Sequence, residues 1–210
     1  MTWRFPHAAL QIFARAPVPG EAKTRLIPLL GAAGAAELHA RLLRRTVETA
    51  LAASLAPVQL WCTPDCDHPA FRAWPEVSRH LQQGGELGER MAHALSSGLR
   101  RAERVVLIGT DCPGLDAAYL QRALEFLADH DVVLGPAEDG GYVLIGCRRP
   151  VEIFHRIDWG TDRVLLQTRE RLREAGIGWR ELPLRWDVDR PPDLQRMVAG
   201  GYLETYKAVE

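Results

Sequence analysis

The residues best suited to chemistry lie in loops that follow apolar runs. The segment LQIFARAPVPGEAKTRL begins like a buried strand and then breaks at two prolines and Gly20. Proline and glycine make such a loop rigid or permit unusual backbone angles. Lys23 and Arg25 follow the break, and Arg15 precedes it as a third cation. Cations beside backbone N–H groups are typical of a phosphate site, and a surface turn with solvated charges is the alternative.

Carboxylates follow other predicted strands. The run VVLIGTD ends at Asp111, and a proline and a glycine turn the chain soon afterwards. A carboxylate at the end of a buried strand is well placed to hold Mg²⁺ or Mn²⁺, which prefer oxygen ligands, although it could also cap a turn. In WDVDRPPDL, Asp187 and Asp189 flank one residue, so an extended chain places both carboxylates on one side. They could complete the same metal site, or Asp189 could cap the helix that the two prolines begin.

A glycine-containing turn joins two further apolar runs in GPAEDGGYVLIGC. Asp139 adds a carboxylate at the mouth of a strand, and Gly140 and Gly141 permit close approach of the backbone to a ligand. A hairpin turn built on DGG explains the same residues. The two interpretations are compatible, so the turn is a candidate part of a binding site.

Two loops before predicted helices could contact a ligand that contains a ring. In HLQQGGELGERM, Gly85 and Gly88 would let the main chain approach a planar base, and a plain loop and helix start is the alternative. In IDWGTDRVLLQT, Trp159 is either a core residue or a stacking surface, and Thr161 or Gly160 could cap the helix that follows. Neither loop establishes a site by itself.

These loops are positioned by strands that alternate with helices. Buried strands are predicted at residues 8–13, 58–62, 105–108, 132–134 and 142–146. Helical spacing of apolar residues predicts helices at 32–54, 88–101, 116–129 and 161–175. This alternation predicts a three-layer α/β/α domain with a mostly parallel mixed sheet, whose ligands bind at the carboxyl ends of the strands.

The composition of the 210 residues fits one cytoplasmic domain. Hydrophobic residues make up 47% and charged residues 25%, and a formal net charge of -1 without a long basic tract argues against nucleic acid as a partner. The N-terminus lacks the features of a signal peptide, and no apolar run of membrane-spanning length is expected. Cys62, Cys66 and His68 could form half of a zinc site, but no second ligand pair follows, which favours reduced thiols.

Six ordered motifs together resemble one superfamily. They are FARAPVPGEAKTRL, GGELGERM, GTDCPGL, AEDGGYVLIG, WGTDRVLLQT and DVDRPPDL, and they span nearly the whole chain. This set is similar to the glycosyltransferase-A, or nucleotide-diphospho-sugar transferase, superfamily. Within it, the chain resembles a bacterial family of small glycosyltransferase-like proteins of largely unassigned function, related to the 2-phospho-lactate and molybdenum-cofactor guanylyltransferases. The resemblance implies one domain with that Rossmann-like fold, in which about residues 1–115 bind the nucleotide and about residues 116–210 bind the acceptor.

The resemblance also implies roles for individual residues. Asp111 and Asp189 would hold Mg²⁺ or Mn²⁺, and Asp111 would act in catalysis with Lys23 and Arg25. The residues implied to bind the nucleotide are Arg15, Gly20, Lys23, Arg25, Gly85, Leu87 and Gly88. The residues implied to bind the acceptor are Asp139, Gly140, Gly141, Trp159, Thr161 and Asp162. The chain departs from the family at Arg190, where threonine is common, and this adds a charge beside the Asp189 carboxylate.

Two reactions that occur on this fold need the same charges. A glycosyltransferase moves a sugar from a nucleotide diphosphate, whereas a nucleotidyltransferase joins a nucleoside triphosphate to an acceptor phosphate, and each must stabilise a diphosphate-like group. We expect a metal-dependent transferase with a sugar nucleotide as donor and a small-molecule acceptor. The alternatives are a guanylyltransferase-like activity on a small phosphorylated acid and a non-catalytic nucleotide-binding protein. The sequence leaves open the base, the sugar, the acceptor and the oligomeric state.

Overall fold

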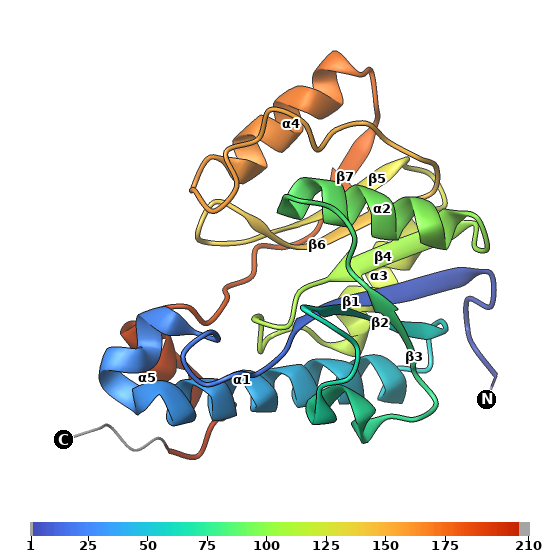
Figure 1. Ribbon diagram of the computed structural model, residues 1–210. Coiled ribbons are helices and arrows are strands. Elements are labelled where there is room, and N and C mark those ends of the chain that lie inside the picture. The colour runs from blue at the N-terminus through green and yellow to red at the C-terminus, as the bar shows by residue number, and fades with distance from the viewer. Residues whose placement is uncertain (1, 206–210) are drawn as a thin grey trace.

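The fold is built on a seven-stranded sheet with the strand order β3-β2-β1-β4-β6-β5-β7. The structure is a computed structural model and describes residues 2–205 (Figure 1). Its strands are β1 (Ala8–Arg15), β2 (Val58–Thr63), β3 (Ser78–Leu81), β4 (Arg104–Ile108), β5 (Val132–Pro136), β6 (Tyr142–Cys147) and β7 (Trp179–Glu181). Neighbouring strands are parallel except at β6, which runs antiparallel to both β4 and β5. The predicted mixed, mostly parallel sheet is confirmed.

The central strands alternate their side chains between two apolar layers. On β1, Leu10 and Ile12 belong to one core cluster and Ala9 to the other. On β4, Val106 joins the first cluster and Val105 the second. All five side chains are buried. Continuous apolar strands are expected when helices cover both faces of a sheet, because successive side chains point to opposite faces.

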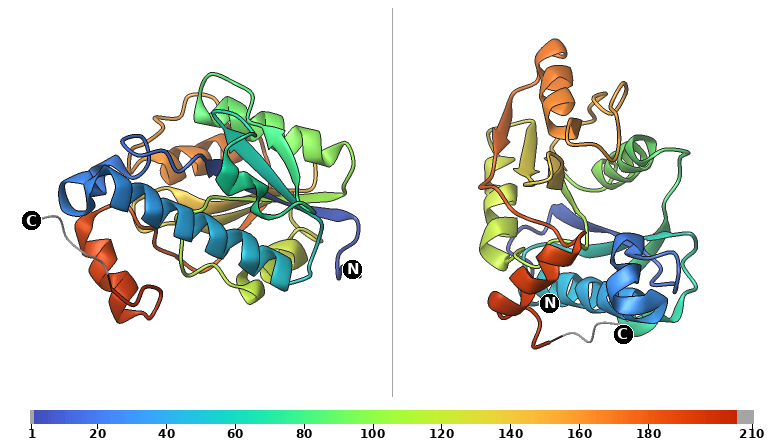
Figure 2. Two further views of the ribbon diagram at one scale, coloured as in Figure 1. Left: turned by 60° about the horizontal axis from the view of Figure 1, so that its bottom comes forward. Right: turned by 90° about the vertical axis from the view of Figure 1, so that its left-hand side faces the viewer.

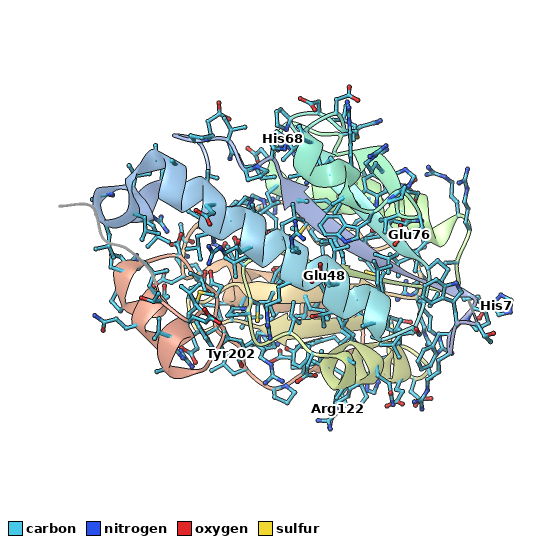
Figure 3. All side chains as sticks on the ribbon, turned by 90° about the horizontal axis from the view of Figure 1, so that it is seen from below. His7, Glu48, His68, Glu76, Arg122 and Tyr202 are labelled. Carbon is cyan, nitrogen blue, oxygen red and sulfur yellow. The ribbon has the colours of Figure 1, made fainter. Side chains whose placement is uncertain are left out.

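Helices cover both faces of this sheet (Figure 2). α1 (Ile27–Ala52) and α3 (Ala117–Phe126) pack on one face, and α2 (Leu87–Leu99) and α4 (Val164–Glu174) pack on the other. On α1, Leu42 and Val47 are buried, whereas Glu48 is exposed. Figure 3, which views the molecule from below, labels Glu48 on the outward face of this helix. This is the spacing of an amphipathic helix. The predicted three-layer α/β/α architecture is confirmed.

Several boundaries differ from the expectation for local reasons. The first long helix begins at Ile27 rather than at residue 32, and Gly31, with a φ of 69°, kinks it near its start. α4 begins at Val164 rather than at residue 161, because the Thr161 hydroxyl donates to the Asp158 carbonyl oxygen at 2.8 Å and holds a turn. The edge strands β3 and β7 are short and largely polar, so apolar periodicity did not predict them.

One segment corrects the expectation that no run reaches membrane-spanning length. The helical segment Thr24–Ala52 is long and apolar enough to cross a membrane by composition. In the structure it consists of the short 3₁₀ helix η1 (Thr24–Leu26) and α1. Its apolar side packs on the sheet and on the last helix. A core helix of a globular domain has the same composition, and α1 is packed in that way.

The carboxyl-terminal segment crosses the end of the sheet. In this strap, residues 182–203, the Arg185 N–H donates to the Pro136 carbonyl oxygen, and the Arg185 carbonyl accepts from the Glu138 N–H, both at 2.9 Å. The strap then forms α5 (Pro191–Ala199), the helix predicted from its two prolines, which packs beside the start of α1 through Leu194 and Met197 (Figure 1). The strap thereby carries its aspartates to the ends of the central strands.

Candidate active site

A pocket of about 680 Å³ opens where the strand order reverses. The connection from β1 leads to β2, and the connection from β4 leads to β5, on the opposite side of this strand pair. Such a switch point at the carboxyl ends of the strands is where open α/β sheets bind ligands. The pocket is lined from both loops, from the turn between β5 and β6, from the loop before α4 and from the strap. These segments gather on the left-hand side of Figure 1.

Lys23 and Asp111 form an ion pair inside this pocket. The Lys23 ammonium lies 2.8 Å from Asp111 Oδ1, and the lysine side chain is only 6% exposed. Lys23 reaches this position from a left-handed backbone conformation, with a φ of 48° and a ψ of 46°. Burial by itself would raise the pKa of Asp111, but the charge and hydrogen bond of Lys23 help to outweigh it and hold the pKa below its usual value. Asp111 is therefore ionised at neutral pH.

His39 of α1 is a third member of this cluster. Its Nε2–H donates to the Arg15 carbonyl oxygen at 3.0 Å, because a carbonyl can only accept. The other ring nitrogen, Nδ1, lies 3.8 Å from Asp111 Oδ1. Burial lowers the pKa of His39 by more than the Asp111 charge raises it, so the ring is neutral at pH 7. No sequence pattern singles out His39, since it lies on the buried side of an amphipathic helix like a core residue.

The strap brings two more aspartates to Asp111. The Val188 N–H donates to the Asp111 carbonyl oxygen at 2.8 Å, and the Val188 carbonyl accepts from the Lys23 ammonium. Val188 is fully buried, and Asp187 and Asp189 on either side of it both line the pocket. Their spacing predicts this shared direction.

The two strap aspartates differ in their electrostatic surroundings. Asp189 forms an ion pair with Arg25. It does not cap α5, because the N-cap position belongs to Arg190, and the Asp193 carboxylate accepts the N–H groups of Asp189 and Arg190 just before the helix. Burial, followed by the charges of Asp139 and Asp111, raises the pKa of Asp187 to about 6. Asp187 therefore stays beside Asp189 as a candidate cation ligand, as the spacing of the two residues predicts.

The oxygen atoms of this cluster fit a hard divalent cation, although they do not form a closed site as arranged. Within residues 2–205, no group of three or more His, Cys, Asp or Glu side chains could hold a metal ion. This applies also to the cysteine and histidine group at residues 62–68. Mg²⁺ and Mn²⁺ prefer oxygen ligands, and Mg²⁺ is often held by one or two carboxylates that substrate phosphates complement. Asp111 with Asp187 or Asp189 supplies such a set.

Two glycines hold the loop before α4 against the rest of the site. A Cβ at Gly140, whose φ is 87°, would lie 2.1 Å from the Asp162 carbonyl oxygen. The Gly140 carbonyl accepts from the Leu165 N–H at 2.8 Å. A Cβ at Gly88 would lie 2.7 Å from the Trp159 ring. Because only glycine permits these approaches, the loop is fixed between α2 and the β5–β6 turn. That turn is the hairpin predicted from DGG.

Most of the predicted site residues line the pocket. Those that do so are Arg15, Lys23, Arg25, Leu87, Asp111, Asp139, Gly141, Trp159, Thr161 and Asp189. The predicted residues outside the lining are Gly20, Gly85, Gly88, Gly140 and Asp162, of which the last three shape its wall through close packing. Sequence reasoning missed Arg90 and Tyr142, which also line the pocket, because each fits the ordinary pattern of its helix or strand.

Comparison with known proteins agrees with this architecture. A structure from Desulfovibrio desulfuricans G20, provisionally named a nucleotide-diphospho-sugar transferase, is 36% identical, with 89% of this chain and 84% of that chain covered and a TM-score of 0.82. CMP:2-keto-3-deoxy-manno-octonic acid synthetase complexed with CTP is 16% identical, with 94% and 99% covered and a TM-score of 0.62. Rv0371c from Mycobacterium tuberculosis H37Rv is 18% identical, with 95% and 100% covered and a TM-score of 0.61. None of the curated proteins matches the sequence.

The fold and the 36% identity define a member of the nucleotide-diphospho-sugar transferase superfamily. This confirms the resemblance that the six motifs indicate. More narrowly, residues 46–161 match the family described as an uncharacterized protein conserved in bacteria (DUF2064), and the chain belongs to that family.

Proposed function

We propose that the protein is a divalent-metal-dependent transferase that holds a sugar nucleotide by its phosphate chain and transfers the sugar. The observation that carries this proposal is the arrangement of charge in the pocket. Lys23 and Arg25 come from the loop after β1, and the carboxylates of Asp111, Asp187 and Asp189 face them. A diphosphate that must bind and depart needs cations for its oxygens and a metal ion held by carboxylates.

Family membership supports the general class of reaction. The 36% identical structure is named as a nucleotide-diphospho-sugar transferase, and a relative by fold was solved with CTP bound. These relatives support a nucleotide-using transferase. The sugar donor and the metal dependence are our assignments from the charges of this pocket.

We place the metal between Asp111 and the strap aspartates. Asp189 is the ligand that the superfamily motif implies, and Asp187 is the carboxyl group that Asp111 and Asp139 crowd. A divalent cation there would neutralise charge that builds on the departing diphosphate. A structure of Rv0371c contains manganese. Mn²⁺ is therefore the first ion to test here.

The side chains of the protein would divide the binding of the ligand between them. Lys23 and Arg25 would bind and orient the phosphate oxygens, since charge-assisted hydrogen bonds to phosphate are strong. Leu87 and the loop at Gly85 would flank the base. Trp159 would contact the acceptor, together with the β5–β6 turn. In this proposal, about residues 1–115 bind the nucleotide and about residues 116–210 bind the acceptor around one shared pocket.

Thermal denaturation with ligands tests the binding part of this proposal. In Mn²⁺, we expect a sugar nucleotide and its nucleoside diphosphate to raise the melting temperature, because a ligand that binds only the folded state stabilises it. At about 100 times Kd the gain is about 2.7 kcal/mol, or about 5–11 °C for a chain of this length. Asp111→Asn and Lys23→Met should remove the shift.

Two exposed residues provide matched controls for these variants. Arg122 lies in α3 and Asp129 lies just beyond it, and neither lines the pocket. Figure 3 labels Arg122 on the surface. Asp129→Asn and Arg122→Met should keep the full shift. If no nucleotide or sugar nucleotide stabilises the wild-type protein in Mn²⁺, the proposal is wrong.

Product analysis separates the two transferase reactions. Sugar transfer releases a nucleoside diphosphate from the sugar nucleotide, whereas nucleotidyl transfer releases pyrophosphate from a nucleoside triphosphate. We therefore expect nucleoside diphosphate when the sugar nucleotide that binds is incubated with candidate acceptors and Mn²⁺. Release of pyrophosphate with a phosphorylated acid would instead establish the guanylyltransferase-like reaction. Binding without either product would identify a nucleotide-binding protein without turnover.

A further inference from the structure

The pocket has two halves of different chemical character. The phosphate half is lined by Arg15, Lys23 and Arg25. The acceptor half, formed by the β5–β6 turn, β6 and the start of α4 with its preceding loop, is lined by Asp139, Tyr142, Trp159, Thr161 and Val164. Among the described residues, these elements contribute no lysine or arginine to the lining. These elements therefore offer a bound group a carboxylate and apolar surface, and they supply no cation.

Arginines close to the acceptor half are engaged by other partners. Arg163 pairs with Asp158 at 3.4 Å. Arg196 binds both carboxylate oxygens of Glu138, at 2.6 and 3.0 Å. Arg90 of α2 lines the pocket, but its guanidinium donates to two backbone carbonyls of the glycine-rich loop before α2, at 3.0 Å each. The pairs with Asp158 and Glu138 neutralise Arg163 and Arg196, Arg90 is held against the glycine-rich loop, and among the described residues none of the three forms an ion pair with Asp139.

Asp139 gives the acceptor half this negative charge. Its Oδ1 accepts the Gly141 N–H at 2.9 Å, which orients the carboxylate, and the residue is exposed. A hydroxyl group can donate a hydrogen bond to this carboxylate, whereas a phosphate offers mainly acceptors and is repelled.

Trp159 supplies an apolar surface in a fixed position. Its ring packs against the backbone of Gly88, where a Cβ would come within 2.7 Å. The backbone N–H of Trp159 donates to the Ile157 carbonyl oxygen at 3.0 Å, and this bond holds the turn. The ring is only partly buried and lines the pocket. A rigid aromatic face packs well on the C–H face of a sugar ring, whose hydroxyl groups remain free at its edge.

We propose that the acceptor half binds an uncharged group with several hydroxyls, such as an unmodified sugar ring, and excludes phosphorylated acids. The inference rests on the proposed function, because the acceptor half is defined by its position beside the phosphate chain of the bound nucleotide. Its hydroxyls donate to Asp139 and its apolar face packs on Trp159. A phosphorylated acid would place at least two negative charges beside Asp139, and the elements of the acceptor half supply no cation to receive them.

A competition between matched neutral and charged probes tests this inference. The protein is saturated with Mn²⁺ and with the nucleoside diphosphate that stabilises it most. Glucose, mannose and galactose are then titrated by calorimetry, each against its 6-phosphate, together with 2-phospholactate. We expect at least one hexose to bind at least about tenfold more tightly than its phosphate and than 2-phospholactate, since each factor of ten is only about 1.4 kcal/mol.

Two substitutions connect this preference to its cause. Asp139→Asn should shrink the gap between the hexose and its 6-phosphate severalfold, and Trp159→Ala should weaken the hexose while leaving 2-phospholactate just as weak. Asp129→Asn, an exposed change on another surface, should keep the wild-type ratio. Tighter binding of any phosphate than of its parent hexose, no binding of any hexose, or an unchanged ratio in Asp139→Asn would overturn the inference while the proposed function stands. Failure of every nucleotide to bind would overturn both.

Discussion

Replacing Asp187 with asparagine should stabilise the metal-free protein at neutral pH. Burial and the carboxylates of Asp139 and Asp111 raise the pKa of Asp187 from 3.8 to about 6. The folded protein therefore binds this proton more tightly than the unfolded chain does. The stability gained from that proton is complete below about pH 4 and is lost as the pH rises through about 6. Asparagine has a similar shape and carries no charge at any of these pH values.

The size of the effect follows from the pKa difference. A shift of about two units corresponds to about 3 kcal/mol, and partial exposure of the side chain with solvent screening reduces this to about 1–2 kcal/mol. For a chain of about 200 residues, that is a rise of about 2–8 °C in melting temperature at pH 7.5. The difference between variant and wild type should fall toward zero near pH 4.

Thermal denaturation in EDTA between pH 4.5 and 8 measures this difference, with Asp129→Asn as the exposed control. Addition of Mn²⁺ together with the nucleoside diphosphate that stabilises the protein most should reverse the order at pH 7.5, because the wild type gains a metal–nucleotide ligand that the variant binds less well. A variant that melts below the wild type in EDTA at pH 7.5, or a difference that does not change with pH, would refute this reasoning. Asp189→Asn in the same assay compares the second strap aspartate directly.

Three further predictions test separate parts of the structure. Lys23→Arg should lose nucleotide binding by calorimetry almost as completely as Lys23→Met, because the larger guanidinium does not fit where the lysine is 6% exposed; retained affinity would show that charge alone suffices. Gly140→Ala should lower the free energy of chemical unfolding by about 2–4 kcal/mol, since its Cβ would lie 2.1 Å from the Asp162 carbonyl oxygen. Gly160→Ala, with a similar φ of 81° and open space around it, should cost only about 1 kcal/mol, and equal losses would contradict the contact. Tyr119→Phe should cost about 1 kcal/mol in the same assay, because its hydroxyl donates to the Pro183 carbonyl oxygen at 3.0 Å; no loss would show that this bond contributes nothing.

The sequence predicted those strands and helices in which the apolar residues follow the pattern of buried positions that the element requires. β1 and β4 are apolar on both faces, and α1 and α2 show the spacing of a helix with one buried side, so each was evident without tertiary information. β3 and β7 pair with only one neighbour at the edges of the sheet, and their short, polar sequences carry no such period. Their existence depends on the strands beside them.

The candidate site was predictable where topology alone brings loops together. Lys23 and Asp111 follow parallel neighbouring strands, so the ends of β1 and β4 bring them to the same place. The pairing of Arg25 with Asp189, 164 residues apart, depends on the path of the strap, which local pattern does not determine. The sequence identified Asp187 and Asp189 as a pair, but only their surroundings distinguish a crowded carboxyl group from one already paired with a cation.

The two ion pairs of the pocket have a consequence for what can enter it. A lone phosphate would have to separate Lys23 and Arg25 from Asp111 and Asp189, and it would leave both carboxylates without a counterion. A lone metal ion would likewise bind the two carboxylates and leave Lys23 and Arg25 without their partners. A metal chelated to a diphosphate exchanges both sets of partners in one step, so metal and nucleotide should each tighten the binding of the other by the same factor. Under the proposed function, the resting pocket would disfavour free phosphate and free metal and would accept the complete metal–nucleotide chelate.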